Sequence, residues 1–250
     1  ATIAGVKYIF TSLNGRGAVT KTRSSDATYI STIQLDASKF TNISAVAANG
    51  STIYVGSFEG WVAAIDGNTN TVTTTYSLAP AQDMLIDLAY HSGSLWASYY
   101  QSARVSKLNS TTLVKSCDAD TSRFGATGQI GSHLKVVGGN LWVMHSASGR
   151  LVRIATDCKI AAFTPSNGSA LTHFFTDNKY IWSVYYLSNK VVAYDIQSGA
   201  YVKEHVVAAG PLAGVYDGSN YWINTLSSPE QFVKYNASFT ELARIGNPNG

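Results

Sequence analysis

The chain of 250 residues is long enough for one large all-β domain or for two smaller domains. Its net charge is +3 and only 13% of its residues are charged. No block of five like charges occurs, which argues against a nucleic-acid or membrane-binding tail. No apolar stretch reaches the roughly 18 residues that a membrane span needs, so we expect no transmembrane segment.

The composition favours β-structure. Tyr (15), Trp (5) and Gly (21) are plentiful, together with Thr, Ser and Val, and these residues suit pleated strands and tight turns. Nowhere do apolar residues recur at helical spacing for three turns. The sequence therefore predicts an all-β protein.

One pattern recurs along the whole chain: an apolar residue followed by an aromatic residue, which we call the anchor. The copies are, in chain order, Ile9-Phe10, Ile53-Tyr54, Leu95-Trp96, Leu141-Trp142, Ile181-Trp182 and Tyr221-Trp222. Successive anchors are 44, 42, 46, 40 and 40 residues apart. A period of roughly 40–45 residues is typical of a four-stranded propeller blade.

Each copy predicts the same order of strands. A short strand and a hairpin turn precede the anchor, as in Val46 to Tyr54 with its Asn49-Gly50 turn. About ten residues after each anchor comes a third strand, as in Val62 to Asp66, and then an outer strand such as Thr71 to Ser77. The first copy is degenerate. We therefore predict a single domain over residues 1–250, a six-bladed β-propeller with four antiparallel strands per blade and a period of about 40–46 residues.

The second copy resembles a known repeat. The segment from Ile53 to Val72, with Ile-Tyr-Val-Gly followed by Val-Ala-Ala-Ile-Asp, resembles the repeat of YVTN-type propellers. It is also similar to the NHL, SMP-30 and streptogramin-lyase-like propellers. The resemblance implies a propeller fold. Many YVTN-type proteins are cell-surface or surface-layer components, whereas relatives with similar blades are lyases or lactonases, so the resemblance alone does not assign a function.

The two cysteines, Cys117 and Cys158, fall in or beside the predicted outer strands of blades three and four. One interpretation is a disulfide between them, which would stabilise the fold by roughly 3–4 kcal/mol. The other is two unrelated buried thiols, because spacing alone does not establish bond geometry.

The sequence contains five Asn-x-Ser/Thr sequons. Each falls in or beside a predicted turn or strand end, where a glycan can project into solvent. These candidate glycosylation sites are Asn42, Asn49, Asn109, Asn167 and Asn236. Together with the low charge, they lead us to expect a secreted or cell-surface glycoprotein.

The repeat register also predicts which side chains lie at the rim of the central channel. Nine residues before the anchor, three consecutive copies carry Asp87, His133 and His173, and His145 follows its own anchor by three residues. Carboxylate and imidazole groups suit a divalent cation, so one hypothesis is a metal or acid–base site in the channel. The alternative is a set of unrelated polar residues hydrogen-bonded around channel water.

Aromatic residues occupy neighbouring rim positions. Tyr99 and Tyr185 lie three residues after their anchors, as His145 does. The tyrosine pairs Tyr99-Tyr100 and Tyr185-Tyr186, with His145, could form a platform for a sugar or a peptide. The alternative is that these rings pack between blades.

We therefore expect a secreted or cell-surface propeller that works by binding, as a surface-layer, extracellular filament or adhesin subunit. Its expected partners are copies of itself or cell-surface proteins and glycans, not nucleic acid. A lectin is one alternative, and a metal-dependent lyase or hydrolase is another. We assign no catalytic residue and no cofactor other than that divalent metal, since no dinucleotide, Walker or Gly-x-Ser-x-Gly motif occurs.

Overall fold

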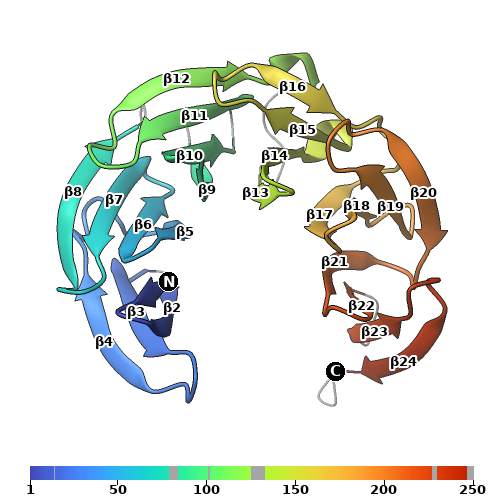
Figure 1. Cartoon of the computed structure of the whole chain (residues 1–250), viewed down its shortest axis with the longest axis horizontal. Helices are drawn as coiled ribbons and strands as arrows, with labels where there is room; N and C mark the ends of the chain where they lie inside the picture. Colours follow the sequence, from blue (N-terminus) through green and yellow to red (C-terminus); the bar gives the residue numbers. More distant parts are fainter. Residues whose placement is uncertain (14, 79–83, 101, 125–132, 227–229, 247–250) are drawn as a thin grey trace. The chain divides into compact units, whose positions relative to one another are not determined.

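The computed structural model describes residues 1–13, 15–78, 84–100, 102–124, 133–226 and 230–246. These residues form 24 strands and two short 3-10 helices, η1 (Ser122–Phe124) and η2 (Ser146–Ser148). The strands build six antiparallel sheets of four strands each, and in every sheet the strands lie in sequence order. The protein is thus all-β, with the six sheets of a six-bladed β-propeller (Figure 1). The predicted fold class is confirmed.

The sheets divide into two compact units of three sheets each. Unit 1 comprises Ala1–Gly128 and Thr156–Lys159, and unit 2 comprises Gln129–Ala155 and Ile160–Gly250. The segment Thr156–Lys159 belongs to unit 1 although both of its neighbouring strands belong to unit 2. The single domain over residues 1–250 stays a prediction.

Unit 1 holds sheets 1 to 3. Sheet 1 contains β1 (Thr2–Ile3), β2 (Val6–Leu13), β3 (Ala18–Arg23) and β4 (Tyr29–Gln34). Sheet 2 contains β5 (Ile43–Asn49), β6 (Thr52–Ser57), β7 (Trp61–Asp66) and β8 (Thr71–Ser77). Sheet 3 contains β9 (Leu85–His91), β10 (Ser94–Tyr99), β11 (Arg104–Asn109) and β12 (Lys115–Asp120).

Unit 2 holds sheets 4 to 6. Sheet 4 contains β13 (Leu134–Val137), β14 (Asn140–His145), β15 (Arg150–Ile154) and β16 (Ile160–Phe163). Sheet 5 contains β17 (Leu171–Thr176), β18 (Tyr180–Tyr185), β19 (Lys190–Asp195) and β20 (Tyr201–Val206). Sheet 6 contains β21 (Pro211–Tyr216), β22 (Tyr221–Thr225), β23 (Gln231–Tyr235) and β24 (Glu241–Gly246).

The hairpin register follows the repeat. In sheets 4, 5 and 6 the aromatic residue of the anchor pairs directly with the residue seven positions before it. These pairs are Lys135 with Trp142, Phe175 with Trp182 and Val215 with Trp222. The turn glycines permit this pairing. In sheet 4, Gly138 and Gly139 have φ of +56° and +73°, which is the left-handed backbone of a type I′ hairpin turn and is open to glycine without a steric cost.

The core lies between neighbouring sheets of each unit. Trp142 and Met144 of sheet 4 pack against Phe174, Ile181 and other apolar residues of sheet 5. Sheet 5 in turn buries Trp182 and Val191 against sheet 6. Burial of this apolar surface is the main stabilising term for such stacked sheets. The second strands of sheets 2 to 5 (β6, β10, β14 and β18) are accordingly buried on both faces.

Sheet 6 differs from the other two sheets of unit 2. Its face toward sheet 5 carries Tyr221, Ile223 and Val233, which are buried. Its opposite face carries Val215 and Phe232, with 57% and 56% of their surface exposed. The pairing of Val215 with Trp222 shows that this exposed face also includes Trp222, the aromatic residue of the sixth anchor.

Candidate functional site

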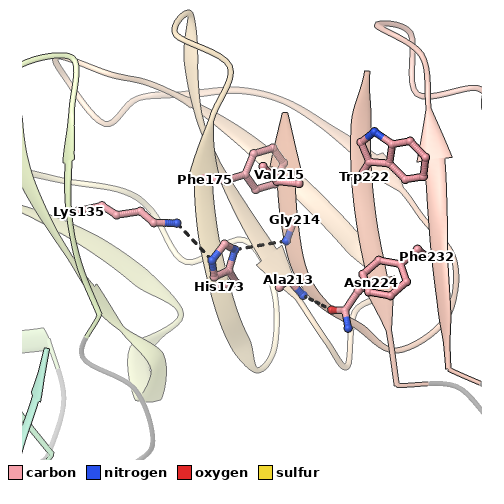
Figure 2. A pocket seen from close by; sticks show the side chains of 9 residues that line it. All are labelled: Lys135, His173, Phe175, Ala213, Gly214, Val215, Trp222, Asn224 and Phe232. Atoms are coloured by element: carbon pink, nitrogen blue, oxygen red, sulfur yellow. Dashed lines mark hydrogen bonds between the residues drawn. The ribbon is translucent and has the colours of Figure 1, made fainter. Parts of the chain in front are cut away.

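Unit 2 contains a pocket of about 450 Å³. Residues of sheets 4, 5 and 6 line it, with β21 and β22 as its longest wall (Figure 2). The lining residues are Lys135, His173, Phe175, Ala213, Gly214, Val215, Trp222, Asn224 and Phe232.

Strand register brings the apolar wall together. Trp222 pairs with Val215 across the β21–β22 hairpin, and Asn224 pairs with Phe232 across β22 and β23. Side chains alternate between the two faces of a strand, so these four residues share one face of sheet 6. A hydrogen bond also fixes the orientation of the Trp222 indole ring: its Nε1–H donates to the Asp217 carboxylate at 2.7 Å.

The polar end of the pocket centres on His173. Its Nδ1 lies 3.3 Å from the backbone nitrogen of Gly214, and its Nε2 lies 3.2 Å from Nζ of Lys135 (Figure 2). Lys135 also donates to the carbonyl oxygen of Phe174 at 2.7 Å. Burial, together with the nearby charges of Lys135 and His133, lowers the pKa of His173 to about 3. The imidazole is therefore neutral at physiological pH.

Asn224 supplies the second polar group. Its Oδ1 accepts a hydrogen bond from the backbone N–H of Ala213 at 3.1 Å. Since one amide oxygen is committed to this bond, the NH2 group is the part of the side chain available to a ligand. The pocket thus combines an aromatic and aliphatic wall with a few N–H donors, the usual composition of a small-molecule site.

Of the predicted metal ligands, His133 and His173 belong to unit 2 and influence each other electrostatically. His133 is exposed just before β13. Asp87 belongs to unit 1, in β9, where its Oδ1 accepts from the N–H of Leu88 at 2.8 Å. Within the described residues, no group of three or more His, Cys, Asp or Glu side chains is arranged to hold a metal ion. The channel metal stays a prediction, and the ammonium beside His173 disfavours a cation there.

The predicted aromatic platform lies in the core. Tyr99 and Tyr185 have no exposed surface. The Tyr99 hydroxyl donates to Ser106 Oγ at 2.9 Å, and the Tyr185 hydroxyl donates to the carbonyl oxygen of Gly149 at 2.8 Å. Buried tyrosines that satisfy their hydroxyls in this way are packing residues, so a ligand role for these two rings stays a prediction that their burial does not favour.

His145 lies at the end of β14 and is 8% exposed. Burial lowers its pKa, and Ser148 Oγ lies 3.3 Å from its Nδ1. Its position fits a neutral, packed histidine better than a rim residue.

Two of the five sequons have an exposed asparagine. Asn49 is exposed at the end of β5, and Asn109 is exposed at the end of β11. Asn109 and the half-buried Asn236 each close a turn in which Oδ1 accepts backbone N–H groups at 2.9 Å, so Nδ2 is not used by these bonds.

In the other two sequons the side-chain nitrogen of the asparagine is hydrogen-bonded or buried. Asn42 donates from Nδ2 to the Glu59 carboxylate at 2.8 Å, and Nδ2 of Asn167 is buried. A glycan on either nitrogen would have to displace these arrangements. Glycosylation itself stays a prediction.

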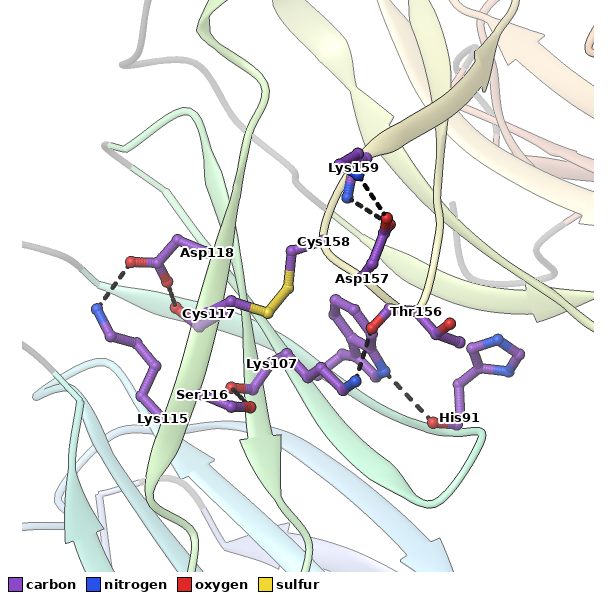
Figure 3. Close-up of a disulfide and its surroundings, with 12 residues drawn as sticks. His91, Lys107, Lys115, Ser116, Cys117, Asp118, Thr156, Asp157, Cys158 and Lys159 are labelled. Carbon is purple, nitrogen blue, oxygen red and sulfur yellow. Dashed lines mark hydrogen bonds and ion pairs between the residues drawn. A yellow bond between two sulfur atoms is a disulfide. The ribbon is translucent and has the colours of Figure 1, made fainter.

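The cysteines do form a disulfide. Cys117 in β12 and Cys158, in the turn between β15 and β16, are bonded with a Cα–Cα distance of 6.3 Å (Figure 3). Lys107 Nζ anchors the same turn by donating to the carbonyl oxygen of Thr156 at 2.6 Å. The disulfide interpretation is confirmed, and a stable disulfide points to an oxidising compartment. Among the described residues, no helix is long and apolar enough to cross a membrane.

Sequence reasoning missed the two polar residues that matter most to the pocket. Lys135 occupies the position seven residues before the anchor, where the other five copies have Ile3, Ala47, Ala89, Phe175 and Val215. A single charge at an otherwise apolar repeat position is a signal that could have identified it. Asn224 stands two residues after its anchor, where sheets 4 and 5 carry Met144 and Val184 but sheets 1 and 3 carry Ser12 and Ser98, so the repeat does not single it out.

Comparison with known proteins yields one family. A family model described as "Repeat of unknown function (DUF6923)" matches residues 11–166, which is more than half of the chain. No curated protein matches the chain.

Proposed function

We propose that this chain, which belongs to the repeat family DUF6923, is an extracellular protein that works by binding a ligand in the pocket of unit 2. The family description assigns no activity, so the proposal rests on the site itself. The observation that carries it is a pocket of about 450 Å³ whose wall contains Trp222 and Phe232 and whose polar lining residues are Lys135, His173 and Asn224. Pockets of this size and lining are the default binding sites of small molecules.

The proposed location has separate support. The Cys117–Cys158 disulfide fits an oxidising compartment, and Asn49 and Asn109 offer accessible sequons. The similarity of the blade repeat to YVTN-type propellers, many of which are surface proteins, agrees with this placement. We propose membership of that wider propeller group on the same grounds.

A binding screen tests the function. A fragment library and a glycan array would be applied to the wild-type protein and to Val215→Phe, which puts a larger side chain on an already exposed wall position. Ligands that bind wild type should bind the variant at least tenfold more weakly. Ligands whose affinity is the same for both proteins, or no ligand from either collection, would count against a binding role for this pocket.

Assembly is a second candidate function, favoured by the exposed apolar face of sheet 6. Val215, Phe232 and Ile245 are each more than half exposed, and Phe232 pairs with Ile245 across β23 and β24. Such patches often mark protein–protein contacts. Light scattering and electron microscopy of wild type and Ile245→Asp would test it. We expect concentration-dependent oligomers or filaments that the variant abolishes, whereas a strict monomer at high concentration would exclude assembly through this face.

A further inference from the structure

Lys21 is a buried lysine at the contact between sheets 1 and 2 of unit 1. It lies in β3, and only 5% of its surface is exposed. None of the other lysines and arginines that the structure describes is buried to this extent. Lysines are rarely buried, because the transfer of an ammonium group out of water costs free energy that its partners must offset. The groups around the Lys21 amine are therefore the place to look for a role.

The Lys21 amine reaches a single turn of sheet 2, the one that joins β7 to β8. Nζ donates to the carbonyl oxygen of Gly67 at 2.6 Å and to Oδ1 of Asn70 at 3.2 Å. It also lies 4.5 Å from the centre of the Tyr8 ring. A buried primary amine is thus in direct contact with a side-chain amide, and these two groups can condense to a new amide bond with the release of ammonia.

The turn that presents Asn70 is fixed in position. A Cβ atom added at Gly67 would lie only 2.6 Å from Cδ1 of Ile3, so the turn is packed closely against sheet 1. Asn70 has a φ of +59°, and its backbone N–H donates to the carbonyl oxygen of Asp66 at 2.7 Å. The amide therefore approaches Lys21 from a backbone that is held at both ends of the turn.

Burial also favours the reactive form of the amine. It lowers the pKa of Lys21, and the charge of Asp66 opposes this only in part. A neutral amine has the lone pair that attacks a carbonyl carbon, and desolvated lysines are the ones that act as nucleophiles. The Cγ carbon of Asn70 is about 1.2 Å from Oδ1, the oxygen that Nζ already contacts. Reactants held together in this way behave as if they were highly concentrated.

A second turn of unit 1 already has a covalent bond at a comparable place. Lys107 occupies in β11 the position that Lys21 occupies in β3, since each pairs with the aromatic residue of its anchor. Its Nζ donates to the carbonyl oxygen of Thr156, in the turn between β15 and β16 (Figure 3). The Cys117–Cys158 disulfide joins this same turn to β12. Where Lys107 meets a turn that is cross-linked, Lys21 meets the turn that carries a side-chain amide.

We propose that Lys21 and Asn70 form an intramolecular isopeptide bond. Nζ attacks Cγ of Asn70 and a C–N bond forms, while the bond from Cγ to Nδ2 breaks. One proton passes from Nζ to Nδ2, which leaves as ammonia, so the step needs no oxidant and no other reactant. Asp66, whose charge acts on Lys21, begins the same turn and can carry this proton. The bond would join sheets 1 and 2 covalently, and it is independent of the pocket in unit 2.

Mass spectrometry of the wild-type protein tests the bond directly. The protein would be produced in a host that does not glycosylate, and its disulfide would be reduced before the measurement. Loss of ammonia should make the chain lighter than its sequence by about 17 Da. Trypsin should then fail to cut after Lys21, and the peptide 17–23 should be found joined to the peptide 40–104. An intact mass equal to that of the sequence would overturn the proposal and would leave Lys21 as a buried lysine held by hydrogen bonds alone.

Two variants and a control locate the bond. Lys21→Arg keeps the positive charge but removes the nucleophilic amine. Asn70→Gly removes the target carbon and suits the φ of +59° at this position. Both variants should show the full mass of their sequences. Lys7→Arg, which changes an exposed lysine of the same sheet, should keep the loss of about 17 Da. Circular dichroism would confirm that each variant is folded, and the wild-type measurement decides the question even if one is not.

Loss of ammonia at another site would give a different result. The exposed Asn49 precedes Gly50, and such a pair can close to a cyclic imide with the same change in mass. Trypsin would then still cut after Lys21, and no joined peptides would appear. A loss of mass that persists in folded Lys21→Arg would likewise contradict the proposal. None of these outcomes bears on the binding function proposed for unit 2, because the two sites share no residue.

Discussion

Removing the Cys117–Cys158 disulfide should cost a large part of the stability of the chain. The two cysteines are separated by 41 residues, so reduction releases a loop of that length in the unfolded chain. In the chain-entropy model, the lost constraint corresponds to about 13 cal/mol/K, or about 4 kcal/mol at 25 °C. Typical domains are stable by only about 5–15 kcal/mol, and the change should therefore be easy to measure.

The assay is urea unfolding of wild type and of the double variant Cys117→Ala/Cys158→Ala, followed by tryptophan fluorescence. The free energy of unfolding should fall by about 3–4 kcal/mol. Reductant should bring wild type down to the level of the double variant and leave the double variant unchanged. A difference below about 1 kcal/mol would mean that the loop is already constrained by other contacts, such as the Lys107–Thr156 hydrogen bond, and would refute the reasoning from loop length.

Three further predictions follow from single positions. Gly214→Ala should lower the free energy of unfolding by about 1–3 kcal/mol, because the new Cβ would lie 2.4 Å from Phe175, and Gly246→Ala, with nothing within 4 Å, is the control in the same denaturation assay. The free energy of unfolding should fall as the pH drops from about 6.5 toward 3, because His173 has a pKa of about 3 in the folded protein and binds its proton more readily in the unfolded chain. Thermal melts of His173→Gln should lose that part of the pH dependence, and a variant that keeps the full wild-type dependence would assign it to other groups. After secretion from a glycosylating host, glycopeptide mapping should find glycans on the exposed Asn109 and none on Asn167, whose Nδ2 is buried, and the reverse occupancy would contradict the sorting of the sequons.

The fold was predictable because its signal is repeated. The anchor residues Trp142 and Trp182 are fully buried between neighbouring sheets of unit 2, and each enforces the same requirement for a large aromatic between two sheets. Local turn chemistry, such as Gly138-Gly139, then sets the register of each hairpin. Repetition of one requirement makes a sequence pattern visible without any knowledge of long-range contacts.

The pocket was much less predictable, since it depends on contacts between sheets. Lys135 and His173 are 38 residues apart and meet only because sheets 4 and 5 pack together. Among the rim positions chosen from the register, His173 lines the pocket of unit 2, whereas Tyr99 and Tyr185 are buried. Position in a repeat tells which strand and face a residue occupies. It does not tell whether the neighbouring sheet covers that face.

The path of the chain near Cys158 has a practical consequence for dissecting the protein. A fragment that begins at residue 133 would contain all three sheets of unit 2. It would also carry Cys158 without Cys117, because the turn that bears it belongs to unit 1. Such a fragment would present a reactive thiol and form cross-linked dimers in air, which would imitate the assembly proposed for sheet 6. Experiments on isolated unit 2 therefore need Cys158→Ser before any oligomer is interpreted.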